Sequence, residues 1–217
     1  AFNTEAERQL CRSVFGRFLA PNSIVGCGIE MAPEAEWSGV KAKYELPDEY
    51  VLYLGRVSKA KVDKLLPYFL RCKAKYGGDA KLVLVGGFEN EIRKFDSPDI
   101  LFTGYVSDEE KTAIVRHATV MVNPSPMESL SLLMLEGMQS RIPLLVNGRS
   151  KVMKDHCRLS GAGLWYNNGR DFRKKLHRLL SDPELRRTMS EKGPAYVREH
   201  YDWEIIIPKL RTLIESI

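Results

Sequence analysis

Two glutamates separated by seven residues are candidates for binding a ligand that carries hydroxyl groups. Glu128 follows a short loop that contains two prolines, and Glu136 interrupts a strongly apolar stretch. A carboxylate among apolar residues is costly unless it accepts hydrogen bonds, and a pair of ligand hydroxyls would donate them. Each glutamate also has a structural interpretation, Glu128 as an exposed loop acid and Glu136 as half of an ion pair. The spacing alone favours neither interpretation.

The residues after Glu128 are predicted to open a buried helix near Ser129. The first N–H groups of a helix lack internal partners and lie at the positive end of its dipole, so an anion is favoured beside them. Phosphate is the natural candidate, and it would be bound by the backbone at Ser129, Leu130 and Ser131.

Two cations follow the first regular apolar run and could neutralise a diphosphate. Arg56 offers a planar fork of donors and Lys61 a point charge. The signal is weak by itself, because basic residues are common before helices and Lys59 competes with Lys61 for the role.

These candidates lie where short apolar runs end. Such runs occupy residues 50–54, 81–85, 100–102, 120–122, 144–146 and 164–166, and helical sequence separates them. This alternation predicts an α/β fold, a Rossmann-like doubly wound parallel sheet of about six strands covered on both faces. Ligands of such sheets bind at the carboxyl ends of the strands, where Arg56 and Glu128 stand.

The expected helices span residues 4–16, 61–76, 89–95, 107–117, 169–181, 183–200 and 203–216. Thr4 with Glu7, and Ser107 with Glu110, have the spacing of capping boxes. Residues 30–49 show no sustained period and are predicted to be a connector.

Composition bounds the class of protein. The chain has 217 residues, 44% hydrophobic and 28% charged, which excludes a disordered or low-complexity chain. No apolar run is long enough for a membrane span, and residues 1–20 do not read as a signal peptide. The four cysteines are scattered without metal-ligand spacing, which fits a reduced compartment. We therefore expect a cytoplasmic protein.

The charge excess of five lies entirely in residues 151–217, which hold 14 Lys/Arg against 9 Asp/Glu. Arg170, Lys174 and Arg178 form a basic stripe at helical spacing. We favour a solvated helix face, with a peripheral contact to the inner face of the cell membrane as the alternative. Nucleic acid ranks third and is not expected as a partner, because no aromatic residues interleave with the charges. His156 has no second histidine at ligand spacing, so a structural or solvated role is favoured over metal binding.

Taken together, these residues resemble the nucleotide-sugar-binding half of a GT-B glycosyltransferase of the family 4 (group 1) type. The resemblance covers essentially the whole chain. It rests on the glutamate pair followed by Gly137-Met138 and residues 142–146, on Leu54-Gly55-Arg56 with Lys61, on Leu84-Val85-Gly86-Gly87, on Phe102-Thr103-Gly104-Tyr105-Val106, and on Tyr201-Asp202-Trp203.

The resemblance implies a role for each candidate. Arg56 and Lys61 would clamp the donor diphosphate, Glu128 would hold the donor sugar, and these three are the expected catalytic residues. Glu136 would bind the ribose hydroxyls. The remaining donor-binding positions would be Ser129, Leu130, Ser131, Gly86, Gly87, Tyr105 and Val106, the last two bordering the base.

The implied reaction is sugar transfer from a UDP-, GDP- or ADP-sugar with retention of configuration, in polysaccharide or glycoconjugate synthesis. No metal or other cofactor is expected, since the sequence has no DxD motif. The sequence departs from the family pattern in three places. Ser129, Leu130 and Ser131 follow Glu128 where glycines are usual, Val62 replaces a common glycine, and Lys151 replaces a common glutamate.

The resemblance also divides the chain. Residues 1–45 would be the connector and the tail of a missing N-terminal acceptor domain, residues 46–200 the donor-binding domain, and residues 201–217 a helix that crosses back to the missing half. We therefore expect weak binding of a nucleoside-diphosphate sugar and little transfer to the acceptor, whose identity the sequence leaves open. The alternatives are a sugar-nucleotide epimerase and a non-catalytic GT-B-like binding module.

Overall fold

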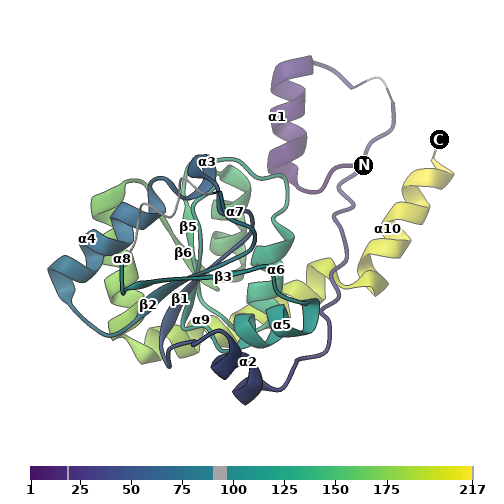
Figure 1. The fold of residues 1–217 in the computed structure, drawn as a ribbon. Helices are drawn as coiled ribbons and strands as arrows, with labels where there is room; N and C mark the ends of the chain where they lie inside the picture. Colours follow the sequence, from purple (N-terminus) through teal and green to yellow (C-terminus); the bar gives the residue numbers. More distant parts are fainter. Residues whose placement is uncertain (19, 90–96, 217) are drawn as a thin grey trace.

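A six-stranded parallel sheet forms the centre of the protein (Figure 1). The computed structural model describes residues 1–18, 20–89 and 97–216. The strand order is β3-β2-β1-β4-β5-β6, and every pairing is parallel. The predicted fold class and all six apolar runs are confirmed. The strands are β1 (Tyr50–Leu54), β2 (Lys81–Val85), β3 (Ile100–Gly104), β4 (Val120–Asn123), β5 (Leu144–Asn147) and β6 (Gly163–Tyr166).

The strand order reverses beside β1. The chain runs outward from β1 to β3, returns to place β4 on the other side of β1, and continues to β6. Val51 pairs with Leu82 of β2 on one side and with Val120 of β4 on the other. A crevice forms at such a reversal, outside the carboxyl ends of the two strands, and ligands bind there.

Side chains of each strand alternate between two cores. In β1, Tyr50 and Leu52 belong to one core cluster, and Val51 and Tyr53 to the other. The first cluster packs under helices α2, α5, α6, α7 and α9, and the second under α4 and α8, so helices cover both faces (Figure 1). The helices are α1 (Glu5–Phe15), α2 (Trp37–Lys43), α3 (Lys59–Val62), α4 (Leu65–Tyr76), α5 (Asp108–Arg116), α6 (Leu132–Gln139), α7 (Lys151–Ser160), α8 (Gly169–Ser181), α9 (Pro183–Tyr201) and α10 (Trp203–Glu215).

Two predictions between residues 30 and 76 were wrong. The helix expected over 61–76 is two helices, α3 and α4, because a continuous helix would need the N–H that Pro67 lacks. The connector expected over 30–49 contains α2, whose amino end is capped by the Glu36 side chain. The helix expected over 89–95 falls mostly on residues outside the described part of the chain.

The remaining helices end close to the predicted residues. In α1, the Thr4 hydroxyl caps the helix by accepting from the N–H of Glu7. In α5, Ser107 and Glu110 form a full capping box. Figure 1 shows α1 and α10 standing away from the sheet. No helix in the described residues is both long and apolar enough to cross a membrane.

Candidate functional site

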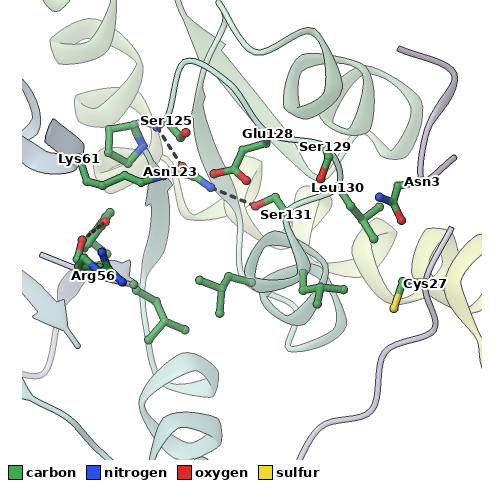
Figure 2. A pocket seen from close by; sticks show the side chains of 16 residues that line it. Asn3, Cys27, Arg56, Lys61, Asn123, Ser125, Glu128, Ser129, Leu130 and Ser131 are labelled. Carbon is green, nitrogen blue, oxygen red and sulfur yellow. Dashed lines mark hydrogen bonds between the residues drawn. The ribbon is translucent and has the colours of Figure 1, made fainter. Parts of the chain in front are cut away.

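A hollow of about 490 Å³ lies at the carboxyl ends of β1 and β4, at the strand reversal. The loop after β1 and the loop between β4 and α6 form most of its wall (Figure 2). Six predicted site residues line it together: Arg56, Lys61, Glu128, Ser129, Leu130 and Ser131. The structure therefore brings together the predicted diphosphate-binding cations, the first glutamate and the loop that follows it.

The two cations lie at one end of this hollow (Figure 2). Both side chains are exposed, and neither forms an ion pair within the described residues. The backbone of Arg56 is fixed because its carbonyl accepts hydrogen bonds from the Tyr53 hydroxyl at 2.9 Å and the Ser58 N–H at 3.1 Å. A fixed backbone with a free guanidinium suits the binding of an anion.

Glu128 also lies on the hollow with its carboxylate uncommitted. No group in the described part of the chain donates a hydrogen bond to it or pairs with its charge. Burial and then the charge of Glu128 raise the pKa of the Tyr53 hydroxyl, which also borders the hollow, to about 12. A carboxylate that faces a hollow without a protein partner can accept hydrogen bonds from ligand hydroxyls.

Two asparagines at strand ends hold the loop between β4 and α6. The Asn123 amide donates to the Ser131 hydroxyl at 3.0 Å, and its carbonyl oxygen accepts from the Ser125 N–H at 3.0 Å. The Asn147 amide donates to the carbonyl of Pro124 at 2.9 Å. These bonds tie the loop to both β4 and β5.

The helix after this loop begins at Leu132, so the predicted start near Ser129 was wrong. Ser131 precedes it in the left-handed region, with φ at 66°, and its side chain does not cap the helix. A residue in that conformation cannot continue a right-handed helix. The free N–H groups of the first turn thus belong to residues from Leu132 onward, and both Leu132 and Leu133 line the hollow.

The match to a known family identifies the class of protein. Residues 39–196 match the family described as glycosyl transferases group 1. The chain belongs to this family. The GT-B resemblance drawn from the motifs is confirmed for family and fold, while the finer family 4 assignment stays a prediction.

Similar proteins are glycosyltransferases and are longer than this chain. It is 30% identical over 174 residues to alpha-D-kanosaminyltransferase of Streptomyces kanamyceticus, covering 74% of this chain and 44% of that protein. It is 26% identical over 132 residues to glycosyltransferase 1 domain-containing protein 1 of Xenopus tropicalis, covering 59% of this chain and 36% of that protein. The matches therefore span less than half of either relative.

The fold is similar to that of Anabaena HepE, which was solved in complex with UDP and glucose. The TM-score is 0.82 at 13% identity, and the match covers 100% of this chain and 62% of that one. At this identity the likeness shows the fold alone.

The second glutamate of this family member does not line the hollow. One carboxylate oxygen of Glu136 lies 3.2 Å from the Lys111 ammonium, and the other is buried without a hydrogen-bond partner in the described residues. Burial would lower the pKa of Lys111, but the charges and hydrogen bonds of Glu136 and Asp108 outweigh it and raise that pKa. Glu136 is thus half of an ion pair, and its predicted contact with ribose stays untested.

A second hollow of about 480 Å³ adjoins the first at Arg56, which borders both. Gly87 and Tyr105 line it, and Tyr105 is 87% exposed. That Tyr105 and Val106 border the base stays a prediction. Val106 packs against the core, and Gly86 lines neither hollow. A Cβ on Gly86 would lie 2.3 Å from the carbonyl oxygen of Gly55, so this glycine lets two strand-end loops approach each other.

Several residues that line the first hollow were not named as site residues from the sequence, among them Asn3, Cys27, Tyr53 and Asn123. Asn123 had a signal, since it ends an apolar run at the sheet edge. For Tyr53, the sequence pattern predicts only a place in a buried strand. Asn3 and Cys27 precede the sheet by many residues, so only the tertiary structure brings them to the site.

His156 lies beneath the loop that follows Glu128. Its Nδ1 is 2.9 Å from the Tyr196 hydroxyl oxygen, and its Nε2 is buried without a hydrogen-bond partner in the part of the chain described. Burial lowers the pKa of His156 to about 4, although the carbonyl of Leu130 and the charge of Asp155 act in the opposite direction. The residue is structural, as favoured from the sequence, and it is not solvated.

Proposed function

We propose that this chain is the donor-binding half of a retaining, metal-independent glycosyltransferase that uses a UDP-, GDP- or ADP-sugar. One observation carries the proposal. Arg56 and Lys61, which pair with no carboxylate among the described residues, and Glu128, whose carboxylate has no partner in the same part of the chain, line one hollow at the strand reversal. Cations match the diphosphate of such a donor, and the carboxylate matches the hydroxyls of its sugar.

The shared position of Arg56 suggests how the donor is oriented. A diphosphate held at Arg56 would extend its nucleoside into the hollow of Gly87 and Tyr105 and its sugar toward Glu128. Negative charge grows on the diphosphate as it leaves. Cations and helix N–H groups that are already in place stabilise this charge without rearrangement.

The acceptor would bind with a second domain, as in a complete GT-B enzyme. The matches span less than half of each curated relative, which supports this part of the proposal. On its own, the chain would bind the donor weakly and transfer little sugar. The wider role would be polysaccharide or glycoconjugate synthesis.

Calorimetric titration of the 217-residue chain with UDP, GDP, ADP and their glucose conjugates tests the donor site. At least one nucleoside diphosphate should bind, and Arg56→Ala or Lys61→Ala should weaken binding about tenfold or more, because each removes a charge-assisted contact. Lys59→Ala is the matched control, since Lys59 is also exposed but does not line the hollow. If no nucleoside diphosphate binds at millimolar concentration, the proposal is wrong.

A further inference from the structure

The first residues of the chain contact the loop that carries Glu128. The Thr4 hydroxyl donates a hydrogen bond to the carbonyl of Ser129 at 3.2 Å, across 125 positions of sequence. The same oxygen accepts from the N–H of Glu7 at 3.1 Å and so caps α1. Thr4 therefore joins the start of α1 to the wall of the hollow.

The segment is also fixed on its other side. The N–H of Phe2 donates to the carbonyl of Ser23 at 2.9 Å, and the carbonyl of Phe2 accepts from Val25 at 2.9 Å and Gly26 at 3.1 Å. Phe2 and Thr4, the two neighbours of Asn3, are thus both anchored. Anchored neighbours limit where the Asn3 side chain can go.

Asn3 lines the hollow with a free amide. Its backbone N–H donates to the Glu7 carboxylate at 2.6 Å, but no residue in the described ranges forms a hydrogen bond with its side chain. In Figure 2, Arg56 and Lys61 lie at one end of the hollow and Asn3 at the other, with Glu128 between them. The residue is half-buried.

We propose that the Asn3 amide binds a hydroxyl of the donor sugar, on the far side of the sugar from the diphosphate. The inference rests on the proposed function, which places the diphosphate at the cations and the sugar beside Glu128. An amide carries two N–H donors and an acceptor oxygen, so it can pair with a neutral hydroxyl in either direction. Thr4 is the positioning residue that holds this contact against the Ser129 loop.

The inference separates sugar binding from nucleotide binding. Asn3 lies away from Arg56, which borders both hollows, so removal of its amide should leave the nucleoside diphosphate in place. The sugar conjugate alone should lose a contact. The ratio of the two affinities is therefore the quantity to measure.

Two variants, Asn3→Ala and Asn3→Leu, test it in the full 217-residue chain. The second variant keeps the branched outline and the number of heavy atoms of asparagine and replaces its polar atoms with methyl groups. Each is titrated with the nucleoside diphosphate that binds the wild type and with the glucose conjugate of that nucleotide, without acceptor. We expect unchanged affinity for the diphosphate and about threefold to tenfold weaker binding of the conjugate, the value of one hydrogen bond.

Asn22→Ala is the matched control. Asn22 belongs to the same N-terminal region but lies outside the hollow, with its amide donating to the carbonyl of Ala20 at 3.3 Å. Unchanged affinity for the conjugate, or an equal loss for both ligands, would overturn the role of Asn3 and leave the donor site intact. Failure of the wild type to bind any nucleoside diphosphate would instead refute the proposed function, and this inference with it.

Discussion

Replacing His156 with glutamine should remove a large part of the acid sensitivity of the fold. His156 is 3% exposed, and its ring packs against the rings of Tyr196 and Tyr201. Burial holds its pKa in the folded protein at about 4, below the ordinary value of 6.5. The imidazole is therefore neutral in the folded state at pH values where it is protonated in the unfolded chain.

The sign of the effect follows from proton binding. As the pH falls through 6.5, the unfolded chain takes up the proton while the folded protein does not. The contribution of His156 to the free energy of unfolding is therefore complete above that pH and is lost toward pH 4. Each unit of pKa difference corresponds to about 1.4 kcal/mol. Between about pH 7.5 and about pH 4.5 the contribution to the free energy of unfolding should fall by about 2 to 3 kcal/mol.

Urea denaturation at the two pH values measures this loss. The wild type should lose about 2 to 3 kcal/mol more than His156→Gln, because glutamine does not titrate and every other group is common to both proteins. His177→Gln is the matched control for the exchange of histidine for glutamine itself; His177 is half-buried and stacks on Tyr76, away from the His156 site. Equal losses for the wild type and His156→Gln would refute a buried neutral histidine at this position.

Two further predictions concern stability, and both are measured by urea denaturation. Lys111→Met should lower the free energy of unfolding by about 1 to 3 kcal/mol because it leaves the Glu136 carboxylate without its ion-pair partner. Adding Glu136→Gln should recover part of the loss. A double variant no more stable than the single one would contradict this account. Gly86→Ala should cost more than about 2 kcal/mol because a Cβ would clash with the Gly55 carbonyl at a φ of 128°. Gly77→Ala, with φ at 71° and open space around it, should cost only about 1 kcal/mol, and equal costs would refute the clash.

The sheet was predictable because parallel strands buried on both faces appear as continuous apolar runs. Helix ends were predictable where side chains cap them, as Thr4 does in α1 and Ser107 in α5. The short helix α2 was missed because its seven residues are too few to show a period and include Gly39.

The candidate site was predictable only where it follows strand ends. Arg56 and Glu128 lie in the loops that follow β1 and β4, so topology alone brings them to one edge of the sheet. The pairing of Glu136 with Lys111 and the position of Asn3 depend on how separate segments pack, and a single sequence carries no local signal for either contact. The left-handed conformation of Ser131 was likewise hidden, because serine, unlike glycine, does not mark such a position.

The loop after Glu128 lacks the glycines usual in the family, yet contacts from three directions hold it in place. Asn123 binds the Ser131 hydroxyl from the sheet, and the Thr4 hydroxyl binds the Ser129 carbonyl from the N-terminal segment. Leu130 lies in the same buried cluster as Tyr196, the partner of His156. A non-glycine residue with positive φ costs about 1 to 2 kcal/mol, and it persists where surrounding contacts determine the conformation. Those contacts therefore allow serine at position 131 while the loop still lines the hollow.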